Sequence, residues 1–130
     1  MANKKLEEKI EMACLGKEKS NYTLIACLHS TKERIIDFEE KISLVIKEVI
    51  KKSNLNLVKG KELVYRFKPY GITALYILKQ SHIAIHTWPE KEFVRVDIFS
   101  CSGKKYAKKA YEEILKVLEP SRVEKVEIYG

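Results

Sequence analysis

The sequence predicts a two-layer α+β sandwich, in which a mostly antiparallel sheet carries helices packed on one face. Three observations lead to this prediction: a length of 130 residues, two apolar stripes at helical spacing, and short β segments joined by hairpin-length links. Such links require antiparallel pairing, and two apolar-striped helices can cover one face of a sheet. The predicted order is β-α-β-β-β-β-α-β, and residues 1–130 form a single domain because no linker divides them.

The first predicted elements are a charged appendage, a strand and a helix. Residues 1–20 predict an N-terminal helical extension, with the helix at 4–13. The apolar run 22–28 predicts a buried strand. Asp37 is the predicted N-cap of the next helix, with Glu40 completing a capping box. The apolar stripe of that helix consists of Phe38, Ile42, Val45, Ile46, Val49 and Ile50.

Turn residues punctuate the rest of the chain. Residues 53–60 are a predicted loop, Pro69 and Gly71 predict a turn, and Pro89 interrupts the ladder before the next strand. Pro120 ends the second predicted helix. The predicted elements are strands at 62–67, 72–78, 82–87 and 93–99, a helix at 104–118 and a final strand at 123–129.

Composition narrows the class of protein. The net charge is +7, but the lysines lie on predicted helices and most of their groups are interleaved with acids, so we expect a solvated helix surface and no nucleic-acid partner. No apolar run approaches the roughly 20 residues that span a bilayer, and the charged N-terminus lacks a secretory signal. We therefore expect a cytoplasmic protein without a membrane partner. The three cysteines are expected to be free thiols.

Four potentially reactive side chains lie between positions 81 and 101: Ser81, His82, His86 and Cys101. Each has an ordinary structural interpretation, as a turn former, a hydrogen-bonded histidine or a small core side chain. Shared metal binding by the two histidines is excluded, because four strand residues span about 13 Å. A Ser-His-Asp hydrolase lacks a nucleophile elbow, and a Cys101–His86 hydrolase has no supporting signature.

Strand parity constrains two of these residues. Ser81 and His86 would face opposite sides of one regular strand. If they cooperate, Ser81 must lie in the turn before the strand, which then begins at His82. The polar pair Lys79-Gln80 makes such a turn reasonable.

Four linked elements lie in the run 67–103: Pro69-Tyr70-Gly71-Ile72-Thr73, Gln80-Ser81-His82, Ile85-His86-Thr87-Trp88-Pro89-Glu90 and Asp97-Ile98-Phe99-Ser100-Cys101. Together they resemble the core of the small prokaryotic S-adenosylmethionine decarboxylase proenzyme family. Their shared order and spacing make the resemblance specific.

The resemblance implies a precursor that cleaves itself. The Ser81 hydroxyl would attack the carbonyl carbon of Gln80, and the resulting ester would be eliminated to leave a pyruvoyl group at residue 81. The products would be a β chain of residues 1–80 and an α chain of residues 81–130. The family assigns processing roles to the residues matching Thr73 and His86.

The same resemblance implies a pyruvoyl-dependent decarboxylase of S-adenosylmethionine, acting in polyamine (spermidine) biosynthesis. The covalent pyruvoyl cofactor would form a Schiff base with the substrate amine and act as an electron sink. Ser81, His86 and Cys101 are the implied catalytic residues, with Cys101 returning the proton. Phe67 and Glu90 are the implied substrate contacts. A homodimer or higher oligomer is expected.

Departures from the family pattern leave alternatives open. Position 80 is Gln where the family has Glu. The family's Gly-x-His-x-x-x-Glu segment should fall where this chain has Asn21, Thr23 and Cys27. One alternative is an arginine or ornithine decarboxylase in which Glu90 or Asp97 meets a cationic side chain. Another is an unprocessed, non-enzymatic paralogue.

Overall fold

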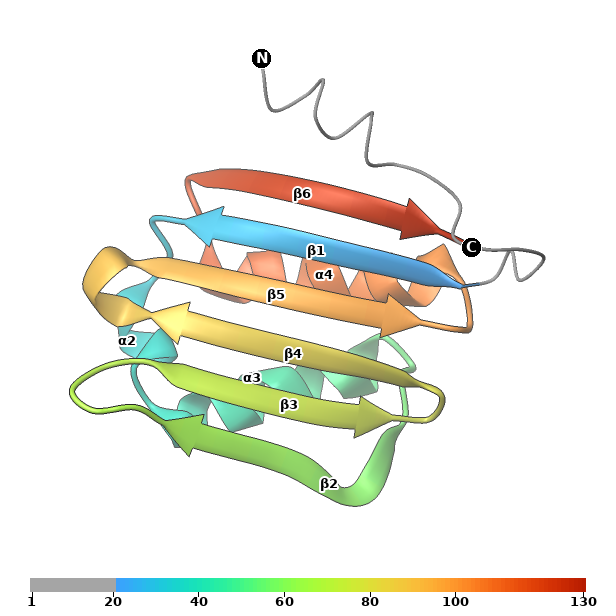
Figure 1. Cartoon of the computed structure of the whole chain (residues 1–130), viewed down its shortest axis with the longest axis horizontal. Coiled ribbons are helices and arrows are strands. Elements are labelled where there is room, and N and C mark those ends of the chain that lie inside the picture. The colour runs from blue at the N-terminus through green and yellow to red at the C-terminus, as the bar shows by residue number, and fades with distance from the viewer. Residues whose placement is uncertain (1–20) are drawn as a thin grey trace.

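The computed structural model describes residues 21–130, which form one six-stranded sheet with helices on one face (Figure 1). The predicted two-layer α+β class is confirmed, whereas the predicted extension at 1–20 lies outside the described residues. The elements are β1 (Tyr22–His29), α2 (Glu33–Ile36), α3 (Glu39–Lys52), β2 (Leu57–Arg66), β3 (Ile72–Leu78), β4 (Ser81–Trp88), the 3₁₀ turn η1 (Pro89–Lys91), β5 (Phe93–Ser100), α4 (Lys104–Leu118) and β6 (Arg122–Tyr129).

The strand order is β2-β3-β4-β5-β1-β6, and every neighbouring pair is antiparallel. The first strand is therefore inserted between two strands from the C-terminal half of the chain, as Figure 1 shows. Tyr22 of β1 lies opposite Ser100 of β5 on one side and Tyr129 of β6 on the other.

The core lies between the sheet and the helices. Alternate residues of each central strand are buried, as in β1, where Tyr22, Leu24, Ala26 and Leu28 face the helices. The helices α3 and α4 turn their apolar stripes to the same layer and lie behind the sheet in Figure 1. Each fully buried large aliphatic side chain contributes about 1.5–3 kcal/mol. This layer therefore holds the sheet in place.

Among residues 21–130, no helix covers the opposite face of the sheet (Figure 1). On β2 and β3 this open face exposes large apolar side chains: Leu63, Tyr65, Leu75 and Ile77 are 66%, 61%, 43% and 53% exposed. Clusters of exposed apolar side chains on adjacent strands are typical of protein–protein interfaces and ligand-binding surfaces.

The predicted start of the first helix is wrong. Asp37 ends the short helix α2, and α3 begins at Glu39 after Phe38, without a side-chain cap. The Asp37 carbonyl accepts a hydrogen bond from the Arg66 guanidinium at 2.9 Å, and the carboxylate lies 3.6 Å from the same group. Phe38, predicted to belong to the apolar stripe, is 45% exposed. Strand β2 also begins earlier than predicted, at Leu57.

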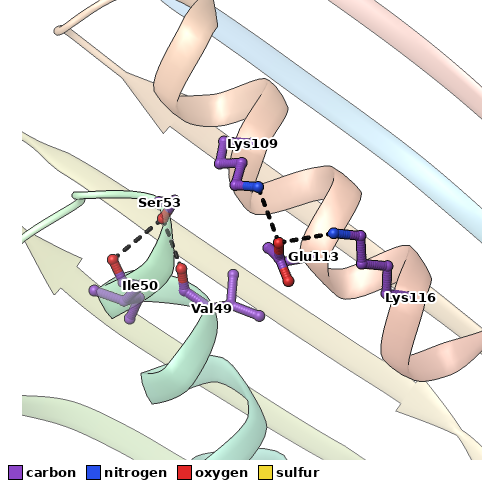
Figure 2. Close-up of polar contacts among 6 residues, drawn as sticks. All are labelled: Val49, Ile50, Ser53, Lys109, Glu113 and Lys116. Carbon is purple, nitrogen blue, oxygen red and sulfur yellow. Dashed lines mark hydrogen bonds and ion pairs between the residues drawn. The ribbon is translucent and has the colours of Figure 1, made fainter.

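The side chain of Ser53 caps the C-terminal end of α3. The Ser53 hydroxyl lies 2.7 Å from the Val49 carbonyl oxygen and 3.2 Å from that of Ile50, as Figure 2 shows. These contacts satisfy carbonyl groups that the end of a helix leaves without a helical partner.

A buried carboxylate is neutralised on the neighbouring helix α4. Glu113 lies 3.1 Å from both the Lys109 and the Lys116 ammonium groups, which come from the preceding and following turns (Figure 2). The hydrogen bond from Lys109, followed by that from Lys116, lowers the pKa of Glu113. The charge can therefore remain at the edge of the helical layer.

A polar cluster around Glu62 links α3 to the sheet. Glu62 of β2 accepts a hydrogen bond from Ser43 at 2.5 Å and lies 3.1 Å from the Lys47 ammonium. Burial raises the pKa of Glu62, but the hydrogen bonds from Ser43 and Lys47 outweigh it, so the net shift is downward. Burial, together with Glu62, raises the pKa of Tyr76 well above its ordinary range.

None of the helices between residues 21 and 130 is long and apolar enough to cross a membrane.

Candidate active site

The β3–β4 hairpin carries the first group of candidate residues. Lys79 and Gln80 form its two-residue turn, and Ser81 pairs with Leu78 as the first residue of β4. Ser81 is thus in the strand and not in the turn, which corrects the prediction from parity. Its side chain is 7% exposed and lies on the helix-covered face. Gln80 has φ of +59°, a left-handed conformation that is unfavourable for a residue with a Cβ.

The Ser81 hydroxyl is held by residue 101. The Cys101 N–H donates to Ser81 Oγ at 3.2 Å, and this oxygen lies 3.9 Å from Cys101 Sγ. The thiol in turn donates to Gln80 Oε1 at 3.4 Å. Gln80, Ser81 and Cys101 therefore form one connected group at the start of β4, although 20 positions separate the serine from the cysteine.

The chain turns sharply next to this group. Strand β5 ends at Ser100, and α4 begins at Lys104 after Gly103, which has φ of +105°. A Cβ at Gly103 would meet no atom within 4 Å, so the backbone angle is what favours glycine here. This turn places Cys101 beside the hairpin.

The second group lies at the other end of β4. Thr73 and His86 face each other across β3 and β4, with 3.0 Å between Thr73 Oγ1 and His86 Nδ1. They border a hollow of about 310 Å³. Its lining residues are Phe67, Tyr70, Gly71, Ile72, Thr73, His86, Thr87, Trp88 and Glu90. The predicted substrate contacts Phe67 and Glu90 are thus close to Thr73 and His86.

The two groups do not meet within one chain. Ser81 and His86 are five strand residues apart, a separation of about 16 Å. Their side chains also lie on opposite faces, since Ser81 is on the helix-covered face and His86 on the open face. The structure therefore brings Gln80, Ser81 and Cys101 together, and separately Thr73, His86, Phe67 and Glu90.

Sequence reasoning missed two features of this region. Tyr70 and Trp88 add aromatic walls to the hollow, and their positions beside Gly71 and Pro89 in the turns were the available signal. Arg95, which lies opposite His86, binds Asp97 through Nε–Oδ1 and Nη2–Oδ2 contacts of 2.9 and 3.3 Å. The hydrogen bond to Asp97 raises the pKa of Arg95, so the Asp97 charge is already compensated.

Metal binding receives no geometric support in this part of the chain. Among residues 21–130, no three His, Cys, Asp or Glu side chains are close enough to hold a metal ion. His82 instead stacks on Phe99, with ring centres 5.7 Å apart.

The arrangement at Ser81 suits chemistry on the chain's own backbone. A hydroxyl adjacent to the carbonyl of its own peptide bond can attack that carbonyl in an N-to-O acyl shift. The Cys101 N–H orients the oxygen, and the left-handed conformation of Gln80 carries a backbone cost next to the bond in question. Fold and site define a class: small α+β domains with a hairpin serine suited to self-cleavage.

Comparison with known proteins identifies the family. The family model for S-adenosylmethionine decarboxylase matches residues 22–129. An S-adenosylmethionine decarboxylase proenzyme of a Sulfurihydrogenibium species is 34% identical over 101 residues, covering 78% of this chain and 74% of the relative. The proenzyme of Archaeoglobus fulgidus is 37% identical over 98 residues, covering 75% and 85%. The chain belongs to the S-adenosylmethionine decarboxylase family.

A solved structure agrees with this assignment. The crystal structure of the adenosylmethionine decarboxylase from Aquifex aeolicus aligns with a TM-score of 0.79 and 30% sequence identity. The alignment covers 85% of this chain and 90% of that one. The shared fold therefore extends over most of both chains.

Proposed function

We propose that this chain is a proenzyme that cleaves itself between Gln80 and Ser81 and then decarboxylates S-adenosylmethionine, a step that supplies polyamine (spermidine) biosynthesis. The observation that carries the proposal is the Ser81 hydroxyl, which is buried and held at 3.2 Å by the Cys101 N–H beside the left-handed Gln80. Its support from outside the chain is the family itself, whose members above are named as proenzymes of this decarboxylase.

The cleavage uses atoms already in place. Ser81 Oγ attacks the carbonyl carbon of Gln80, a C–O bond forms, and the C–N bond breaks to give an ester. Removal of the Ser81 α-proton breaks the Cβ–Oγ bond, which releases the Gln80 carboxylate and leaves dehydroalanine. Addition of water and loss of ammonia then give a pyruvoyl group at residue 81. This group would supply an electron sink for loss of CO2 from an α-amino acid.

We propose that the complete site forms between two copies of the chain. Thr73 and His86 are about 16 Å from Ser81 within one protomer. If two sheets stack through their open faces with antiparallel β4 strands, the turn end of one β4 lies over the His86 end of the other, and cleavage then requires the Ser81 hydroxyl, which lies on the helix-covered face, to reach the partner copy's imidazole around the exposed hairpin turn. The exposed apolar side chains of β2 and β3 lie on this face, and Gln80 is exposed at the turn. A two-fold dimer would produce such stacking, since each copy supplies and receives the same surface.

In this arrangement His86 serves as the base that moves protons during cleavage. Histidine is the side chain that most often serves as a general base, and a neutral imidazole nitrogen can accept the hydroxyl proton. The Thr73 hydroxyl, bonded to His86 Nδ1, fixes the ring and is available to stabilise the tetrahedral intermediate. Cys101 holds a proton at Sγ for return to the substrate after CO2 is lost.

The hollow beside His86 suits the substrate. Phe67, Tyr70 and Trp88 offer aromatic faces, which attract a cation such as a sulfonium and stack on a purine base. Glu90 offers a carboxylate that accepts hydrogen bonds from ribose hydroxyls. The Arg95–Asp97 pair removes one of the two carboxylates that an arginine or ornithine substrate could meet, because Asp97 already binds a guanidinium, and leaves Glu90 as the other. The expected cytoplasmic location belongs to this proposal, supported by the free thiols of Cys27 and Cys101.

Intact-mass measurement after warm incubation tests the proposal. We expect two fragments, residues 1–80 and residues 81–130, the second beginning with a pyruvoyl group. The processed protein should release labelled CO2 from S-adenosylmethionine, and a Ser81→Ala variant should neither cleave nor release it. A full-length mass that persists in the unaltered protein would favour the non-enzymatic paralogue. Release of CO2 from arginine or ornithine instead would favour the other decarboxylase.

A further inference from the structure

The cleavage chemistry requires only the backbone carbonyl of Gln80. The side chain of this residue nevertheless makes a contact within the site. Its Oε1 accepts a hydrogen bond from the Cys101 thiol at 3.4 Å. We infer that Gln80 is a positioning residue for self-cleavage: its amide oxygen holds the Cys101 thiol, and this keeps the Cys101 N–H on the Ser81 hydroxyl. This inference rests on the proposed function.

The position of Cys101 explains why a tether matters. Ser100 is the last residue of β5 in the ladder with β1, and α4 begins only at Lys104. Cys101 therefore lies in the turn between the strand and the helix. Its N–H reaches Ser81 Oγ at 3.2 Å, and its thiol reaches the Gln80 side chain. The two bonds fasten Cys101 to both residues of the bond that is to break.

The backbone at position 80 gives an independent reason to expect a role for this side chain. Gln80 has φ of +59°, which glycine or asparagine adopts with less strain in a two-residue hairpin turn. A glutamine here carries a conformational cost that turn formation alone does not explain. The contact with the Cys101 thiol gives this side chain a function. Glycine has no side chain to make the contact, and the side chain of asparagine is shorter by one methylene.

Cleavage would change both polar partners of the thiol. Ser81 Oγ leaves residue 81 as part of the Gln80 carboxylate when the Cβ–Oγ bond breaks. Gln80 then becomes a chain end, no longer joined to β4. Thus the reaction that creates the cofactor also releases the thiol that later delivers a proton. The same side chain positions the precursor and frees the thiol when the precursor is cleaved.

The first test measures thiol reactivity in chains that cannot cleave. In a Ser81→Ala background, alkylation of Cys101 by iodoacetamide is followed by peptide mass mapping, which reports each cysteine separately. Gln80→Met keeps the chain length but removes the amide acceptor, so the rate should rise about three- to tenfold, the range of one neutral hydrogen bond. Gln80→Glu keeps an acceptor and adds a charge that opposes the thiolate, so alkylation at neutral pH should slow. The matched control Lys79→Met changes the neighbouring turn residue.

The second test measures self-cleavage with Ser81 restored. Gln80→Met should slow the appearance of the 81–130 fragment at least threefold, whereas Gln80→Glu should retain the unaltered rate more closely than Gln80→Met does. Equal alkylation and cleavage rates in Gln80→Met and Lys79→Met would overturn the inference. If the unaltered chain fails to cleave, the proposed function is wrong, and the alkylation rates alone still decide whether Gln80 holds the thiol. Thermal melting of each variant separates a lost contact from lost folding.

Discussion

Mixing two inactive variants tests whether one active site is built from two protomers. Within one chain, Ser81 and His86 are about 16 Å apart and on opposite faces of β4. A Ser81→Ala chain lacks the nucleophile, and a His86→Ala chain lacks the base, whose loss should slow cleavage about 10²-fold or more. Each variant alone should therefore remain largely uncleaved.

The expected recovery follows from random pairing. When the two chains are co-expressed in equal amounts, half of all dimers are hybrids, and one of the two sites in each hybrid has both intact residues. About half of the His86→Ala chains should then cleave, and activity should reach about a quarter of the unaltered level. An affinity tag on one chain allows intact-mass analysis to assign the fragments. Absence of any cleavage in purified hybrids would refute a shared site. Efficient cleavage by a monomeric fraction of the unaltered protein would refute it equally.

Three further predictions concern single positions. Gly71→Ala should lower the free energy of unfolding by about 1–3 kcal/mol, because φ is +103° and the new Cβ would lie 3.0 Å from the Thr87 carbonyl oxygen. The control Gly60→Ala is also at positive φ, but its Cβ would lie in open space, so it should lower the urea midpoint less than Gly71→Ala does. Phe67→Leu should raise KM for S-adenosylmethionine about fivefold or more with little change in kcat, since stacking contributes about 1–3 kcal/mol, and an unchanged KM would remove Phe67 from the site. The hydrogen bonds that lower the pKa of Glu62 despite its burial stabilise the fold above about pH 4.3, and this contribution is lost as the pH falls. Urea midpoints of Glu62→Gln should therefore depend less on pH between 3 and 6 than those of the unaltered protein.

Local patterns predicted the layers of this fold well. The 3.6-residue period of α4 and the proline after it gave the bounds Lys104–Leu118, and the apolar run before the Lys79-Gln80 turn gave β3 its bounds Ile72–Leu78. Short helix α2 offered too few residues to show a period. The predicted cap at Asp37 was wrong because a residue remote in sequence, Arg66, binds that carbonyl and carboxylate.

The candidate site shows a different limit. Parity indicated that Ser81 and His86 could not cooperate within one regular strand, and the sequence interpretation resolved this by moving Ser81 into the turn. The structure keeps Ser81 in β4, so the conflict is real, and it is the reason for proposing a second protomer. The Cys101 N–H on Ser81 Oγ was not predictable, because every non-proline residue has such a donor and only the fold selects one.

The insertion of β1 between β5 and β6 affects what happens after the hairpin is cut. Strand β1 would then belong to the fragment 1–80, and both of its neighbours to the fragment 81–130. Two ladders of eight residue pairs each would join the fragments there, in addition to the ladder between β3 and β4. The two fragments would be interleaved and could not separate without unfolding the sheet. Unfolding of the processed protein would, however, also separate two chains that are no longer covalently joined. Its melting temperature should therefore depend on protein concentration because of the cleavage alone, in addition to any dependence due to dimerisation.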